Sequence, residues 1–125
     1  MKYRNQKELE AGLAKWVRIL HLQDWEIFVS FVPQSTWDER TQCADCAVRK
    51  ARYSADIRLA SFDTLDLLGA PQQADMERTL VHELLHCVFR AGLLWQDDVC
   101  EKGENSHYEH ATEQVARTLV ELDRA

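Results

Sequence analysis

Apolar residues recur at helical and strand spacings along most of the chain, and these spacings predict its elements. Between about residues 5 and 21 they fall three or four positions apart, which is typical of a helix with one buried stripe. From Asp24 to Pro33 a set of apolar residues falls at every second position, with Glu26 and Ser30 among the residues between them, which predicts a half-buried strand that Pro33 ends. The helical stripe comprises Leu9, Leu13, Trp16, Val17 and Leu20, and the alternating positions are Trp25, Ile27, Val29 and Phe31.

The next part of the chain predicts a loop and then two more strands. Residues 34–42 are polar and aperiodic, as in a loop, and strands are expected at about 43–53 and 55–60. In the second of these strands Ile57 and Leu59 should point into the core, and Asp56 and Arg58 should point away from it.

Two helices are predicted in the remainder. Asp75 and Glu77 suit the start of a helix, where negative side chains are favoured, and Gly92 suits its end. Apolar residues surround much of this helix, which places it in the middle of the domain. After a polar connection at 96–106, a last helix is expected from about His107 to Leu122. Its predicted buried stripe is Val115, Ala116, Leu119 and Leu122.

The order helix, strands, helix, helix predicts an α+β fold with helices packed on one side of a small sheet. With 125 residues and no internal repeats, residues 1–125 are expected to form a single domain. The 46% apolar and 29% charged content is ordinary for a soluble globular protein. No apolar run reaches the ~20 residues of a membrane span, and the start lacks a signal-peptide core. We therefore expect a cytoplasmic protein without a membrane partner.

Charge and cysteine content narrow the expected partners. The formal net charge of −6 gives no attraction to phosphate backbones, so nucleic acid is not the expected partner. In a reducing compartment the four cysteines are expected to be thiols or metal ligands before disulfides. Cys43 and Cys46 form a CxxC pair whose metal or redox role is a minor alternative to simple packing. The basic, aromatic stretch 49–53 is expected to be a solvated strand face or a substrate-pairing edge.

The stretch VHELLH, residues 81–86, carries the candidate chemistry. On a helix His82 and His86 lie one turn apart on the same face, so both imidazoles can bind one ion, and Glu83 is adjacent. In this HExxH arrangement the histidines bind Zn²⁺ and the glutamate acts as general base in amide hydrolysis. Two histidines and a carboxylate in an apolar setting would be costly without such a partner, which favours a metal site over ordinary core residues.

A catalytic zinc site usually needs a third protein ligand. The metzincin pattern HExxHxxGxxH is excluded, because Phe89 stands at its glycine position and Gly92 at its third histidine. The remaining donors lie on the last predicted helix, at Glu109, His110 and Glu113.

With HELLH followed by Glu113-Gln-Val-Ala116, the chain resembles the small gluzincin-type zincins, including metallopeptidase-like proteins of phages and prophages. The resemblance implies an N-terminal helix, about three strands in a mostly antiparallel or mixed sheet, the HExxH helix, and a following helix with an ExxA glutamate ligand. It implies zinc bound by His82, His86 and Glu113, with Glu83 as general base.

Alternatives to Glu113 remain on the same helix. Glu113 is preferred because it shares a helical face with Ala116 and Val120. Glu109 could instead be the ligand, with Glu113 behind it holding a histidine by its second ring nitrogen. His110 would give a three-histidine site like that of SprT-type zincins. Tyr108 or His107 could stabilise an oxyanion, although an exposed helix start explains both equally well.

The sequence thus predicts a zinc metallopeptidase that hydrolyses peptide or protein substrates. The alternative from another functional class is a noncatalytic module on the same scaffold, which binds zinc for stability and interacts with a partner protein. An intact Glu83 favours the enzyme, since a structural site would use four protein ligands and no base.

Overall fold

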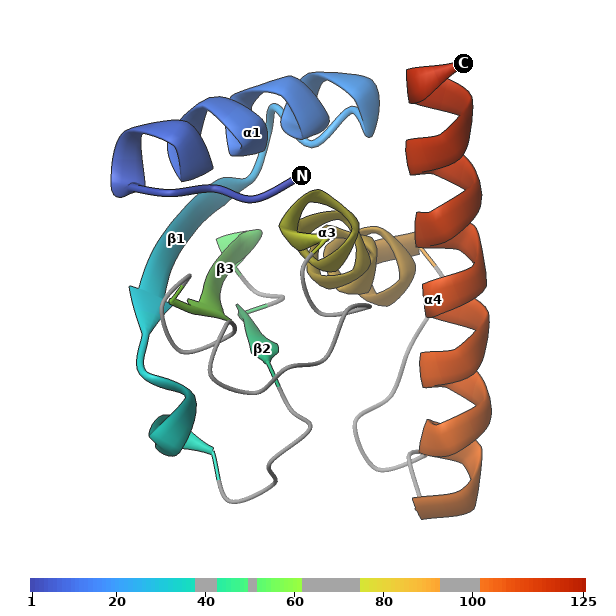
Figure 1. Ribbon diagram of the computed structural model, residues 1–125. Helices are drawn as coiled ribbons and strands as arrows, with labels where there is room; N and C mark the ends of the chain where they lie inside the picture. Colours follow the sequence, from blue (N-terminus) through green and yellow to red (C-terminus); the bar gives the residue numbers. More distant parts are fainter. Residues whose placement is uncertain (38–42, 50–51, 62–74, 93–101) are drawn as a thin grey trace.

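The computed structural model describes residues 1–37, 43–49, 52–61, 75–92 and 102–125, apart from the side chains of Gln34, 90–92 and 102–107 (Figure 1). In chain order the elements are α1 (Gln6–Ile19), β1 (Glu26–Val32), the short 3-10 helix η1 (Gln34–Thr36), β2 (Ala44–Arg49), β3 (Ser54–Ala60), α3 (Met76–Gly92) and α4 (Lys102–Arg124). The remainder of the predicted loop at 34–42 and most of the connection at 96–106 lie outside the described residues.

The three strands form a mixed sheet in the order β1-β3-β2. β3 pairs in parallel with β1, where Val29 is opposite Ile57, and antiparallel with β2, where Cys46 is opposite Ile57. The α+β class predicted from the chain is confirmed at this level, with three α-helices and a three-stranded mixed sheet among the described residues. None of the described helices combines the length and apolar character that crossing a membrane requires.

The core lies between the sheet and the helices α1 and α3. α1 packs on β1, while α3 packs on β2 and β3 and lies between the sheet and α4 (Figure 1). The predicted inward residues Ile57 and Leu59 are buried, as are Leu9 and Trp16 of α1. Leu80, Val81 and Leu84 fill the centre from α3. The prediction that the second long helix is central is therefore confirmed.

The other face of the sheet is covered by ion pairs between neighbouring strands. Arg58 pairs with Asp45 directly opposite on β2, and Arg49 Nη1 lies 2.7 Å from Asp56 Oδ2. Trp37 Nε1 donates to Asp45 Oδ2 at 3.1 Å. The basic residue Arg49 is thus engaged with a carboxylate on the solvated face of the sheet.

The prediction for the last helix is wrong in two respects. α4 begins at Lys102, five residues before the expected start, because adding a turn to an existing helix costs little even where the sequence has no apolar stripe. The buried side chains are Thr112, Ala116 and Val120, whereas Val115 is 39% exposed and Leu122 is 68% exposed. A row with a period of four, which includes a threonine and an alanine, faces α3, so the larger apolar residues beside it remain in contact with solvent.

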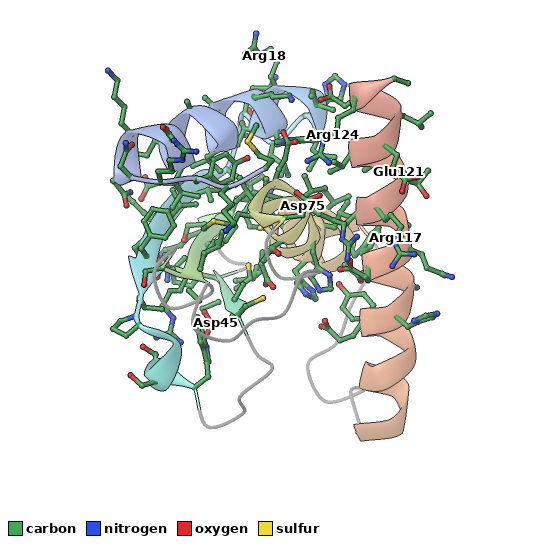
Figure 2. All side chains as sticks on the ribbon, in the orientation of Figure 1. Arg18, Asp45, Asp75, Arg117, Glu121 and Arg124 are labelled. Carbon is green, nitrogen blue, oxygen red and sulfur yellow. The ribbon has the colours of Figure 1, made fainter. Side chains whose placement is uncertain are left out.

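A buried carboxylate joins α1, α3 and α4. Glu77 is only 2% exposed and accepts hydrogen bonds from Trp16 Nε1 at 2.9 Å, Lys15 Nζ at 3.1 Å and Arg124 Nη2 at 3.0 Å. Arg124 also donates to both carboxylate oxygens of Asp75, at 3.0 and 3.1 Å, and both residues are labelled in Figure 2. Burial raises the pKa of Glu77, but the three donors outweigh burial and its pKa lies below the ordinary value. We call Lys15, Asp75, Glu77 and Arg124 the charge cluster.

We expect Glu77→Ala to lower the free energy of unfolding by about 1–3 kcal/mol, because the buried Trp16 Nε1 loses its acceptor. Urea denaturation of the variant and the wild type measures this difference. Glu121→Ala, on the exposed side of α4, is the matched control and should stay within about 0.5 kcal/mol of the wild type. Equal losses in the two variants would show that the charge cluster does not stabilise the fold.

Candidate metal centre

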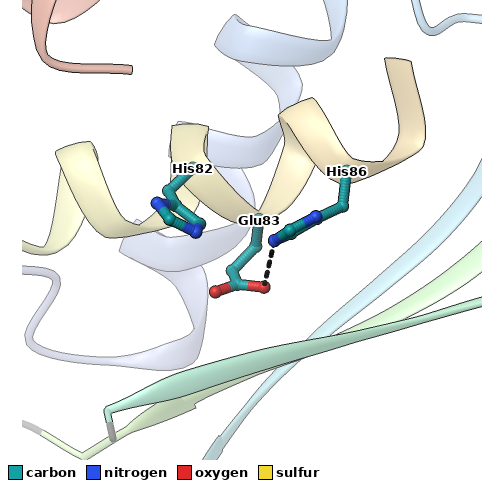
Figure 3. Close-up of side chains that lie close together, drawn as sticks. All are labelled: His82, Glu83 and His86. Atoms are coloured by element: carbon teal, nitrogen blue, oxygen red, sulfur yellow. Dashed lines mark ion pairs between the residues drawn. The ribbon is translucent and has the colours of Figure 1, made fainter. Parts of the chain in front are cut away.

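The helical phase of α3 brings the side chains of VHELLH together. His82, Glu83 and His86 each offer a ligand atom within 4.8 Å of the others, so this group could hold a metal ion. Figure 3 shows the three side chains on the same side of α3, where His86 Nε2 lies 4.0 Å from Glu83 Oε2. Glu83 and His86 are buried, at 7% and 6% exposure. The core residues on the other sides of α3 hold the helix in this orientation.

Helix α4 supplies a carboxylate to the same point. Glu109 Oε2 lies 2.9 Å from His82 Nε2, and Glu109 Oε1 lies 3.2 Å from His86 Nε2. One carboxylate therefore spans the Nε2 atoms of both histidines.

The second ring nitrogens of the two histidines contact other residues of α4. His82 Nδ1 lies 2.8 Å from Glu113 Oε2, and His86 Nδ1 lies 3.2 Å from the Tyr108 hydroxyl. The other oxygen of Glu113, Oε1, pairs with Arg78 Nε at 2.7 Å. Each imidazole is thus held by α4 on its Nδ1 side and faces Glu109 on its Nε2 side.

An open cleft of about 240 Å³ lies over this group. Besides the ionisable residues, small side chains from β2 and the first turns of α3 line it. Its lining residues are Cys43, Ala44, Thr79, His82, Glu83, Glu109 and Glu113. The cleft therefore gives access from solvent to His82, Glu83, Glu109 and Glu113, beside the start of β2.

Burial and the neighbouring carboxylates shift the pKa values of His82 and Glu83. Burial lowers the pKa of His82, but hydrogen bonds to Glu109 and Glu113 outweigh it and raise the pKa from 6.5 to about 10. Burial raises the pKa of Glu83 to about 8, and the charges of Glu109 and Glu113 add to this rise although His82 opposes it. The surroundings of His82 thus favour a positive charge at its ring, which suits a cation at this point.

The remaining candidate residues are placed as follows. His110 is exposed and is not among the residues that line the cleft. The side chain of His107 and all of Cys100 lie outside the described residues. Cys43 lines the cleft, Cys46 is half-buried on β2 and Cys87 is buried in the core, and none of these three is in a disulfide. Cys87 packs in the core as a small apolar side chain.

Residues that sequence reasoning did not single out complete the centre. Arg78 and Thr79 lie one turn before His82 and Glu83, so the i, i+4 rule that relates the two histidines also places them beside the centre. Ala44 carries no chemical signal, and only its position at the start of β2 makes it part of the cleft.

Comparison of the chain with protein-family models, curated proteins and solved structures finds no match.

Proposed function

We propose that this protein is a zinc-dependent metallopeptidase of the zincin type. The observation that carries the proposal is the convergence of His82 Nε2 and His86 Nε2 on one carboxylate, beside the buried Glu83 and under an open cleft. Two imidazoles and carboxylates within a few ångströms form the donor set that zinc takes in hydrolytic sites. When bound, zinc polarises a scissile carbonyl and makes water acidic near neutral pH.

The contacts at Nδ1 support this assignment of the histidines. An ionised Glu113 only accepts hydrogen bonds, so it keeps a proton on His82 Nδ1. The Tyr108 oxygen can accept from His86 Nδ1 in the same way. Glu109 favours a second proton on His82 Nε2 when no ion is bound, in line with the raised pKa of His82, and a metal ion would take the place of that second proton. With the Nδ1 protons held in this way, both Nε2 atoms would face a bound ion next to Glu109.

We infer that Glu109 is the third ligand and that Glu113 orients His82. Glu109 contacts the Nε2 atoms of both histidines, whereas Glu113 contacts only Nδ1 of His82. This arrangement supports the alternative in which Glu113 lies behind the ligand set. The assignment of Glu113 as the ligand, which the ExxA resemblance implies, stays the competing prediction.

Glu83 is proposed as the general base. Its carboxylate lies beside the histidines and lines the cleft, within reach of a water that attacks a bound peptide. It takes the proton of the attacking water and passes it to the leaving amine. The substrate is a peptide or protein segment that enters the cleft next to β2.

A specific observation also supports the noncatalytic alternative. The carboxylate of Glu83 is itself within ligand distance of the two histidines, so together with Glu109 it would make four protein donors. Four protein ligands are typical of a structural zinc site. The two functions differ in the role of Glu83. It accepts a proton in the peptidase, and it binds the metal in the noncatalytic module.

The proposed function predicts that zinc removal and His82→Ala have the same consequence. Either should abolish cleavage of a peptide library, because chelation removes the ion and the two ligands that remain in His82→Ala hold it poorly. Elemental analysis of the purified variant should show loss of zinc, and the chelated wild type should recover cleavage when zinc is added.

His110→Ala is the matched control, since it removes an exposed histidine from α4. It should retain both the zinc and the cleavage. If His82→Ala binds as much zinc as the wild type, the metal is held elsewhere and the proposal is wrong. If the wild type binds zinc but cleaves no member of the library, the noncatalytic alternative replaces it.

A further inference from the structure

Arg78 is linked to the metal centre through one carboxylate. Arg78 and His82 lie four residues apart, so they stack on the same face of α3. Both reach Glu113 on α4, with Arg78 Nε 2.7 Å from Oε1 and His82 Nδ1 2.8 Å from Oε2. The carboxylate is therefore held at both of its oxygens by residues of the neighbouring helix.

This link holds a side chain that would otherwise be mobile. Glu113 is about one-third exposed, at 32%, and a glutamate with one contact can rotate about three torsions. A second contact from a guanidinium fixes the plane of the carboxylate, because the N–H directions of arginine are rigid. The orientation of the His82 ring then depends on Arg78 through Glu113.

The ion pair between Arg78 and Glu113 is partly solvated, with side-chain exposures of 24% and 32%. Pairs of this kind contribute little to folding stability. A role of Arg78 should therefore be visible in the metal affinity of the centre far more than in the stability of the fold.

We propose that Arg78 is a positioning residue, which fixes the Glu113 carboxylate so that Glu113 orients His82 for metal binding. The proposal rests on the function proposed above, with His82 as a metal ligand. The proposal adds a residue outside the HExxH motif, so that His82 is oriented by Arg78 on α3 together with Glu113 on α4.

The test measures zinc affinity by competition with a chromophoric chelator for four proteins: the wild type, Arg78→Met, Glu113→Gln and the double variant. Loss of an outer contact to a metal ligand typically lowers affinity about 10–100-fold. We expect Arg78→Met to weaken zinc binding about 10-fold. The double variant should bind zinc no more weakly than Glu113→Gln, because both changes remove the same support.

Arg117→Met is the matched control. Arg117 lies one turn after Glu113 and is exposed on α4 (Figure 2). The charges of Arg117 and Arg78 both lower the pKa of the Glu113 carboxyl. Unchanged zinc affinity in this control, together with the loss in Arg78→Met, would assign the effect to the contact with Glu113 and not to local charge. Arg78→Lys, which keeps the charge without the rigid N–H geometry, should recover only part of the affinity.

Other outcomes overturn the proposal in distinguishable ways. If the wild type binds zinc and Arg78→Met binds it equally well, Arg78 has no positioning role, and the proposed function still stands. Additive losses in the double variant show that Arg78 does not act through Glu113. A similar loss of zinc affinity in Arg117→Met would show that the positive charge near Glu113, and not the contact with Arg78, sets the affinity. A wild type that binds no zinc would refute both the proposed function and this proposal.

Discussion

Replacement of Glu83 by glutamine is expected to lower kcat for peptide hydrolysis about 10²–10⁴-fold, while zinc remains bound. Glutamine has nearly the shape of glutamate, so the buried position beside His86 is kept. It cannot accept a proton from the attacking water, which removes the step assigned to Glu83. Single-turnover cleavage of a peptide substrate and zinc content in the same preparation measure the two quantities.

The same variant separates the two candidate functions. If Glu83 is a ligand of a structural site, Glu83→Gln loses zinc affinity and stability, and the wild type has no cleavage to lose. Glu121→Gln serves as a control for the loss of one negative charge at an exposed position of α4. Equal cleavage by Glu83→Gln and the wild type would exclude Glu83 as the general base.

Glu109→Ala is expected to weaken zinc binding by more than ~100-fold, and Glu113→Ala by about 10–100-fold. The first variant removes a carboxylate that contacts both Nε2 atoms, whereas the second removes a contact to Nδ1 of His82. Zinc affinities from chelator competition give the order directly. The reverse order would make Glu113 the ligand, as the ExxA resemblance implies, and would leave the roles of His82 and His86 intact.

The parts of the fold that could be predicted from the sequence are those with a clear apolar period. Ile57 and Leu59 alternate with the charged residues Asp56 and Arg58, and Leu9 and Trp16 fall at helical spacing, so their burial followed from pattern alone. The grouping of His82, Glu83 and His86 followed from the i, i+4 geometry of a helix, because all three lie on one element.

Positions that depend on contact between two elements could not be predicted in this way. Glu77 is charged and near a helix start, which suggests exposure, yet three donors from two other helices compensate its burial. On α4 the apolar residues support several phases, and the phase with Thr112 in the core is fixed by how α4 meets α3. The choice between Glu109 and Glu113 depends on that same phase, so sequence reasoning left both open.

The charge cluster has a consequence for when the centre forms during synthesis. Arg124 lies in the last turn of α4, and its contacts with Asp75 and Glu77 hold the end of α4 against the start of α3. A growing chain is released from the ribosome from its N-terminus onward, so α1, the sheet and α3 emerge before this anchor exists. A nascent chain therefore exposes VHELLH before the carboxylates of α4 are in place, and the metal centre can be completed only after the whole of α4 has left the ribosome.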